Sequence, residues 1–439
     1  MYLIEKGKDL GPDYLGKLLP LFQTKELPKL NKWKKYYDGR HKILQKPDRD
    51  GKPVNRIVVN YAYDIVKNYQ GYLTGVPITY ENDDEAFQKL LDVLNYNDVE
   101  SEDSEYLKNA LIYGVAYEIN YIDEENEQRF RLFDSRECIP VYENNLNNDL
   151  LYVVRFYRED LLDKSNENYI VEVYGPSDVK TYRSSMGFVS FELINVEPHF
   201  YGQCPITVFK IDDEVSIFNQ IMSLQDGYNN LMSDIVDDED SFADAYLVLK
   251  GLTADEEDLA KMKQNRALIM DVDASAEFLT KDASDTRTTE TLQTFNDQIY
   301  HISGCPDFSD EKFMAQSGIA LRYKLVAFEN MASTIEKQMK KALQRRLELI
   351  SAIFSLTDDA PWQDCEIKFT RNLPISLEPT TPDELNSYRG LVSNYTLLSL
   401  LPFVKDPDIE MELVNNENSY DLFANEEEER DIDEDGENQ

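Results

Sequence analysis

The chain has 439 residues and a formal charge of −39, because 84 aspartate and glutamate residues outnumber 45 lysine and arginine residues. This length allows two or three domains with a sizeable core. The acidic balance disfavours a simple clamp on nucleic-acid phosphates, which needs clustered basic residues, and favours basic partners or cations.

The cysteines and the apolar segments indicate where the protein resides. Four cysteines stand far apart, at positions 138, 204, 305 and 365, without a Cys-x-x-Cys pair. Neither a zinc ribbon nor a disulfide framework is indicated, and a reducing compartment fits. No stretch has the length and composition of a signal peptide or a membrane span. We therefore expect a soluble, intracellular protein with no membrane partner.

The first fifty residues predict short helices, including the basic and aromatic segment Lys29–Lys42. Its cations could contact nucleic acid or lipid headgroups, but a solvated helical face is the favoured interpretation.

Residues 55–80 predict a helix that leads into a strand. Apolar and tyrosine side chains recur at every fourth position, which places them on one helix face; they are Ile57, Tyr61, Ile65, Tyr69 and Leu73. We expect Gly75 to end the helix in a left-handed conformation, and Pro77 cannot continue it. The segment carries no catalytic constellation, so the stripe is interpreted as core.

A second helix is expected at 101–113, followed by a β-rich block with hairpins. Alternating patterns predict strands in this block, at 114–122, 128–133, 150–157, 168–175, 178–183, 188–194 and 206–211.

Helical periodicity returns at Ile211 and continues for about seven turns. Only Gln225 and Asn229 interrupt its apolar seam. Such a helix needs a partner. A compact insert follows, for which we expect a strand at 245–250, a helix at 254–263 and a strand at 266–272.

A shorter helix at 288–303 and a loop precede the longest helix, 319–354, of about ten turns. Its apolar stripe runs through Leu321, Leu325, Phe328, Ala332, Ile335, Met339, Ala342, Leu343, Leu347, Ile350 and Phe354. Its cations outnumber its acids, and they are Arg322, Lys324, Lys337, Lys340, Lys341, Arg345 and Arg346. This basic ridge either complements an acidic surface, such as that of a sister subunit, or is an ordinary solvated face.

Beyond this helix, residues 364–376 predict one strand that returns to the β-rich block. Two further helices are expected, at 384–401 and 406–418. The acidic tail, 426–439, should be disordered.

A search for catalytic motifs finds no phosphate-binding loop, zinc helix or nucleophile elbow. The three histidines lie in different segments. Asp431, Asp433 and Asp435 imitate a calcium loop but lack its twelfth ligand. The run 237–240, with Asp244, could bind metals in a nuclease, although consecutive helical residues point in different directions. We expect no enzyme, no metal and no cofactor.

Three motifs indicate a family. The stretch NRIVVNYAYDIVKNYQGYLTGVPITY (55–80) resembles the signature of the portal proteins of tailed bacteriophages, in the siphophage-type branch. GCPDF (304–308) and SGIALRYK (317–324) resemble the tunnel-loop region of that family, and DAYLVLKG (244–251) resembles the entry to its clip. The resemblance extends to about residue 420.

The resemblance implies an α+β portal fold with a β-rich wing, long stem and spine helices, a small α/β clip and a helical crown. The implied division is wing 1–210, stem helix 211–243, clip 244–284, second stem helix 285–303, tunnel loop 304–318, spine helix 319–356, wing return strand 357–380, crown 381–425 and disordered tail 426–439.

The resemblance also implies a function. A ring of about twelve copies would occupy one capsid vertex of the virion, after assembly in the host cytoplasm with scaffold and major capsid protein. Double-stranded DNA would pass through it without sequence specificity during packaging and ejection. The implied channel-loop residues are Asp307, Asp310, Glu311, Lys312, Phe313, Met314, Gln316 and Lys324. The implied clip residues, which would dock the large terminase subunit and the head-to-tail adaptor, are Tyr246, Leu247, Lys250, Glu256, Glu257, Lys261, Lys263 and Arg266.

The acidity suggests a hypothesis for the channel, because an acidic wall binds phosphates weakly and keeps friction on DNA low. The main alternative is an acidic adaptor or DNA-mimic protein, which would be monomeric or dimeric. A metal-dependent nuclease that uses the run 237–240 ranks last.

Overall fold

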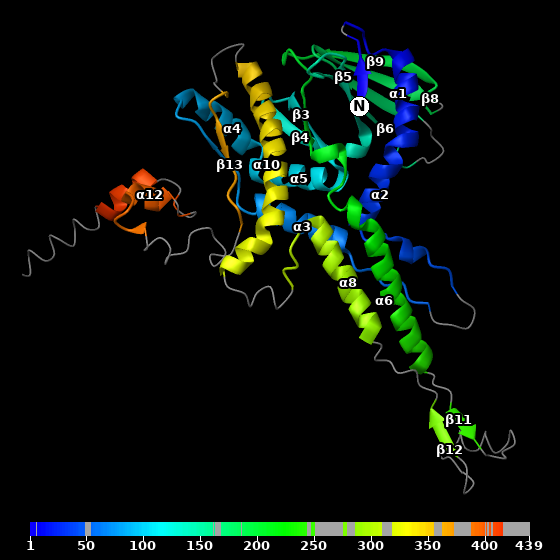
Figure 1. The fold of residues 1–439 in the computed structure, drawn as a ribbon. Coiled ribbons are helices and arrows are strands. Elements are labelled where there is room, and N and C mark those ends of the chain that lie inside the picture. The colour runs from blue at the N-terminus through cyan, green and yellow to red at the C-terminus, as the bar shows by residue number, and fades with distance from the viewer. Residues whose placement is uncertain are drawn as a thin grey trace, which may run out of the picture.

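The computed structural model describes residues 1–5, 7–48, 54–160, 162, 168–185, 187–243, 247–250, 275–278, 286–309, 318–354, 362–372, 388–399, 401, 404 and 407–415. Helices and sheets are mixed, as the α+β prediction required. A body that contains the sheets continues into two neighbouring helices, α6 and α8, and beyond these into a short hairpin (Figure 1). No described helix has the length and apolar character to cross a membrane.

The largest sheet has six strands in the order β1-β5-β6-β7-β8-β9. Its strands are β1 (Tyr2–Ile4), β5 (Cys138–Glu143), β6 (Leu150–Arg158), β7 (Tyr169–Tyr174), β8 (Asp178–Ser185) and β9 (Ser190–Pro198). Only the β1–β5 pair is parallel. The sequence missed β1, which is three residues long, and β5, which contains Pro140. The strand predicted from Phe188 begins at Ser190, because Phe188 lies in the preceding turn with a φ of 73°.

A second sheet has the order β10-β3-β4, with β3 (Val115–Ile122), β4 (Gln128–Phe133) and β10 (Ile206–Lys210). Helix α5 (Val99–Tyr113) packs against all three of its strands. The other helices of this part of the chain are α1 (Pro12–Lys25), α2 (Leu27–Tyr37), α3 (Tyr61–Thr74) and α4 (Gln88–Tyr96). The apolar faces of these helices and one face of the large sheet form one continuous core.

The predicted tyrosine helix is α3, with two corrections. Asn60 caps it by accepting a hydrogen bond from the Tyr63 amide, so Ile57 lies in an extended segment before the helix. Gly75 is right-handed, with a φ of −70°. A Cβ at Gly75 would come within 2.3 Å of the Asn372 side chain, so close approach excludes a larger residue there. The strand expected afterwards is β2 (Thr79–Glu81).

The helix expected from Ile211 begins only at Met222, as α6 (Met222–Ala243). Asp213 is left-handed, which breaks a helix of ordinary residues. The amides of Ile211 and Ile217 bond instead to carbonyls around the end of α5. Residues 211–221 therefore form short turns that pack on α5.

The next two helices agree with the prediction, as α8 (Thr286–Ser303) and α10 (Gly318–Phe354). Among its described side chains, the predicted α10 stripe is buried from Leu325 to Ile350. The return strand is β13 (Glu366–Lys368), but it pairs with β2 in a separate two-stranded sheet and not with the large sheets.

In the insert, β11 (Leu247–Lys250) pairs antiparallel with β12 (Ser275–Phe278). The strand expected at 266–272 and the helix expected at 254–263 lie outside the described residues, and β12 was not predicted. Near the C-terminus, α12 (Asn394–Ser399) and a helical stretch at 407–415 lie within the two predicted helices. The acidic tail lies outside the described residues.

Candidate functional site

Three tyrosine hydroxyls of α3, which form a tyrosine clamp, bind the two helices on either side of the loop between α8 and α10. Tyr61 donates a hydrogen bond of 2.8 Å to Asn296 of α8. Tyr69 donates to the carbonyl of Ser303, the last residue of α8, at 3.1 Å. Tyr72 donates to Glu329 of α10. One helix thereby contacts α8 up to its last residue and α10 at Glu329, about three turns after α10 begins.

The rings of Tyr69 and Tyr72 pack against α10. The centroid of Phe328 lies 4.4 Å from that of Tyr69 and 4.6 Å from that of Tyr72. Tyr69 and Phe328 are fully buried. A tyrosine suits this position because its ring fills the core while its hydroxyl still finds a partner. This arrangement explains why the stripe carries tyrosine in place of leucine.

Polar side chains hold the beginning of the loop. Asn296 donates to Asp307 at 3.0 Å, and Asp307 in turn accepts from the Ser309 amide at 2.9 Å, which forms a local turn. Tyr300 donates to Asp64 of α3 at 3.0 Å. Asp307 is therefore a structural anchor of the loop.

Cys305 belongs to the same anchor and is not a nucleophile. It is buried, and burial raises the pKa of its thiol to about 12. The group is neutral near pH 7, so it lacks the thiolate character that reactivity needs. All four cysteines are free and buried.

Glu329 of α10 connects Tyr72 of α3 to Arg371, which lies in the segment after β13. Arg371 donates to it at 2.8 Å and also pairs with Glu336 at 2.7 Å. Burial alone would raise the pKa of Glu329, but hydrogen bonds from Arg371, Tyr72 and Ser333 lower it below its usual value. The carboxylate therefore stays charged and accepts bonds from three elements of the fold.

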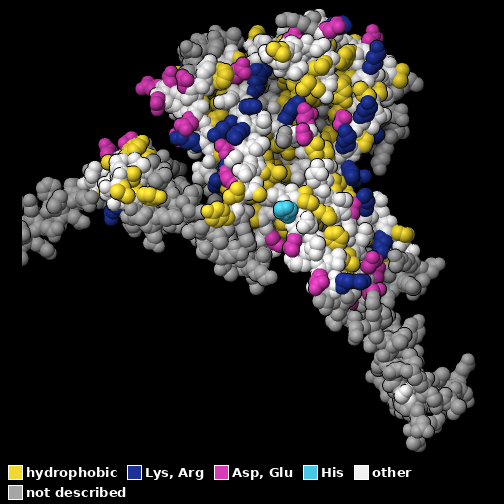
Figure 2. Space-filling view, viewed as in Figure 1, with side chains coloured by type: hydrophobic (Ala, Val, Ile, Leu, Met, Phe, Trp, Pro, Cys, Tyr) yellow, Lys and Arg dark blue, Asp and Glu magenta, His cyan; other side chains and the backbone are white. Residues whose placement is uncertain are grey.

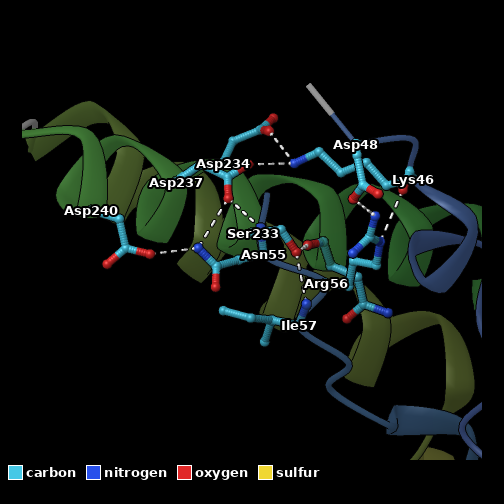
Figure 3. Close-up of polar contacts among 10 residues, drawn as sticks. Lys46, Asp48, Asn55, Arg56, Ile57, Ser233, Asp234, Asp237 and Asp240 are labelled. Atoms are coloured by element: carbon cyan, nitrogen blue, oxygen red, sulfur yellow. Dashed lines mark hydrogen bonds and ion pairs between the residues drawn. The ribbon is translucent and has the colours of Figure 1, made fainter. Parts of the chain in front are cut away.

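A second polar arrangement lies along α6, where every fourth residue is polar and buried. Figure 3 shows part of this polar seam, which consists of Gln225, Asn229, Ser233 and Asp237. Asn229 and Ser233 accept hydrogen bonds of 2.9 Å from the amides of Val59 and Ile57. The seam thus replaces the partner strand that an extended segment would otherwise need. The sequence missed it because its partners lie some 170 residues away.

Two carboxylates of the acidic run at the end of α6 are held by side chains from the segment before α3. Lys46 pairs with Asp237 at 2.7 Å and with Asp234 at 2.9 Å. Asn55 donates to Asp240 at 2.8 Å and to Asp237 as well. No described group of three or more histidine, cysteine or acidic residues could hold a metal ion. These contacts favour a structural role for the run over the nuclease alternative.

His41 lies inside the polar seam. Its ring stacks on Tyr36 at 4.9 Å between centroids and bonds to Asn229 at 2.8 Å. Burial lowers its pKa, against smaller opposing effects of the Tyr36 carbonyl and Asp226. A neutral imidazole fits this site, because Nδ1 must accept from the Asn229 amide.

The predicted basic ridge of α10 is divided by the fold. Arg346 is fully buried and pairs with Asp103 and Glu118, so it does not belong to a surface ridge. Lys337 and Lys341 are exposed.

The other predicted site residues have little described structure. Asp310, Glu311, Lys312, Phe313, Met314 and Gln316 lie outside the described residues, and Lys324 lies in the first turns of α10. In the insert, Leu247 and Lys250 are the end residues of β11, while Tyr246, Glu256, Glu257, Lys261, Lys263 and Arg266 lie outside the described residues.

The chain runs from a sheet-containing body through α6, a short hairpin and α8 to a loop and the longest helix, α10. This order of elements defines the class of protein. Comparison with known proteins names the family. Residues 22–423 match the family model described as phage portal protein, SPP1 Gp6-like, so the chain belongs to the phage portal protein family. This family is a structural, non-enzymatic class, and its members are virion components at the capsid.

Two portal proteins are similar over most of their length. That of Bacillus phage SPP1 is 24% identical over 406 residues, which cover 88% of this chain and 80% of that protein. That of Clostridium phage phiCD119 is 23% identical over 416 residues, with 85% and 89% covered. Among solved structures, a chain in the neck of a native GTA particle with C12 symmetry matches with a TM-score of 0.44, 14% identity, and 77% and 88% coverage.

Proposed function

We propose that the protein is the portal of a phage capsid, a ring of about twelve copies at one vertex through which double-stranded DNA is packaged and ejected. Membership of the portal family over residues 22–423 carries this proposal. In this arrangement the body around the large sheet is the wing, α6 and α8 are the stem, and α10 is the spine. The segment around β11 and β12 is the clip, which docks the large terminase subunit and later the head-to-tail adaptor.

The tyrosine clamp supports a role for the loop 304–318 in the channel. A loop that meets moving DNA needs firm support from the helices on either side of it. Tyr61 and Tyr69 bind α8, which leads into the loop, and Tyr72 binds α10, which follows it. The loop then lines the narrowest part of the channel, with any phosphate contact made through Lys312 or Lys324.

The net charge of −39 supports a channel that does not retain DNA. The test is duplex binding to assembled rings, measured by fluorescence anisotropy at several salt concentrations. Weak binding that changes little with salt is expected, since few counterions are released. Tight binding at moderate salt would overturn the low-friction wall.

The channel role of the loop has its own test. Electron cryo-microscopy of purified rings should show the loops of all subunits converging on the central opening. Loops on the outer surface of the ring would contradict the role.

A further inference from the structure

The outer helices α1 and α2 carry cations that have no ion-pair partner in the described part of the chain. This basic flank consists of Lys17 and Lys25 of α1, Lys32 and Lys35 of α2, and Arg40. All five side chains are exposed. On α1, the partly exposed Leu21 lies between the two lysines on the same face. A run of unpaired cations is notable in a chain with a charge of −39.

An acidic surface lies around β2, α4 and the start of α5. This acidic flank consists of Asp83, Asp84, Glu85, Asp92, Asp98 and Glu100, together with Glu124, Glu125 and Glu127 of the β3–β4 turn, and all nine are exposed. Asn97 joins the two parts, because its side chain bonds to the backbone of Gln128 and Phe130. None of the nine acids has an ion-pair partner among the described residues.

The two flanks lie on opposite sides of the body. Figure 1 places α4 at one edge of the body and α1 and α2 at the other. Figure 2 shows acidic side chains along the first edge and a line of basic side chains along the second. Opposite charges on opposite sides cannot pair within one chain.

We propose that the basic flank of one subunit docks on the acidic flank of a second copy of this chain. The inference rests on the proposed ring, and it adds the surfaces that join the subunits. Because the paired surfaces are different and lie on opposite sides, their repetition gives a head-to-tail contact, which closes a ring and not a twofold dimer. Complementary charge also selects register and partner.

The contact between the flanks offsets the electrostatic repulsion between copies of this acidic chain. Copies that each carry a charge of −39 repel one another at the close spacing of a ring. Pairing of the flanks brings the cations of each subunit against the acids of the next and so lowers the repulsion between the two subunits. Because the charges are exposed and screened by salt, ring formation should weaken as sodium chloride is raised.

Two triple variants of the full chain test the proposal. One carries Lys17→Glu, Lys25→Glu and Lys35→Glu, and the other carries Asp83→Lys, Asp92→Lys and Glu124→Lys. Each alone brings like charges together at every contact, so we expect the ring fraction to fall at least about tenfold in mass photometry. The first variant makes the chain more acidic and the second makes it less acidic, so a shared loss cannot arise from net charge.

The equimolar mixture is the decisive sample, because the two reversed flanks carry opposite charges and fit each other, while the two unchanged flanks still fit at the next contact. We expect rings of alternating subunits, which also shows that both variants are folded. Rings from either variant alone at the wild-type level would overturn the proposal, as would a mixture without rings. Absence of rings in the wild-type protein would instead overturn the proposed function.

Discussion

Arg346 of α10 and Glu118 of β3 form a bidentate ion pair with both side chains fully buried. Nε of Arg346 lies 2.8 Å from Oε1 of Glu118, and Nη2 lies 2.6 Å from Oε2. Asp103 of α5 accepts from Nη1 at 2.5 Å and from Tyr80 at 2.5 Å. One guanidinium thus bridges two buried carboxylates and joins α10 to both α5 and the second sheet.

Replacement of Arg346 by methionine should destabilise the protein strongly, because it leaves two buried carboxylates without a counter-charge. Loss of one partner of a buried ion pair costs about 3–5 kcal/mol. Glu118→Gln should cost less, since Asp103 still balances Arg346. Chemical denaturation followed by circular dichroism measures both. Lys8→Ala, which breaks the exposed pair with Glu5, is the control and should change the stability little, because solvent screens this pair. An equally small effect of Arg346→Met would contradict the structural role.

The hydroxyl of Tyr72 can be removed without changing the packing of its ring. Tyr72→Phe deprives Glu329 of one donor, and hydrogen bonds to charged groups contribute about 1.5–3 kcal/mol. We expect a lower thermal midpoint and faster amide hydrogen exchange at residues 304–309. Tyr63→Phe is the matched control on the same helix, because the Tyr63 side chain is 47% exposed. Equal exchange in the two variants would rule out the clamp.

Gly71 lies inside α3 and Gly75 ends it. Replacing each by alanine separates the effect of close packing on stability from the effect of helix propensity. Gly75→Ala should destabilise, since its Cβ would overlap the Gly71 carbonyl and the Asn372 side chain. Gly71→Ala meets nothing within 4 Å and should stabilise the helix by about 1 kcal/mol. Thermal melts of the two variants should move in opposite directions. Stabilisation by Gly75→Ala would show that the approach of Asn372 is not close.

The amphipathic elements were predictable from the sequence, whereas contacts between distant segments were not. The α10 stripe keeps a helical period from Leu325 to Ile350, so local pattern suffices. The start of α6 was wrong because apolar residues before Met222 pack in turns whose hydrogen bonds go to α5. Gln225 and Asn229 read as interruptions of an apolar seam, yet they bind His41 and residue 59. No local sequence pattern around Gln225 and Asn229 indicates these distant hydrogen-bond partners.

Asp237 should act through the extended segment and not through a metal. Asp237→Ala removes the acceptor of the Asn55 amide and leaves Lys46 with only Asp234, so the thermal midpoint should fall. The exposed Glu239→Ala is the control and should change little. Magnesium or manganese should not raise the midpoint of the wild type. DNA cleavage that needs either metal and is lost in Asp237→Ala would restore the nuclease alternative.

Stability should fall as the pH drops below about 6.5, because burial lowers the pKa of His41 in the folded chain. The unfolded state then binds more protons than the folded state, and protonation favours unfolding. His199 contributes in the same direction, since its pKa is also lowered by burial. His41→Gln should therefore remove part of the slope between pH 7 and 5, and His41→Gln with His199→Gln should remove more. A slope unchanged in the double variant would contradict this assignment.

The mass of the purified protein in solution tests the portal assignment most directly. Light scattering of the full chain, with electron micrographs of the same fraction, should give a closed ring of about a dozen 51.0 kDa subunits with a central opening. A stable dimer without an opening would contradict the assignment and favour an acidic adaptor.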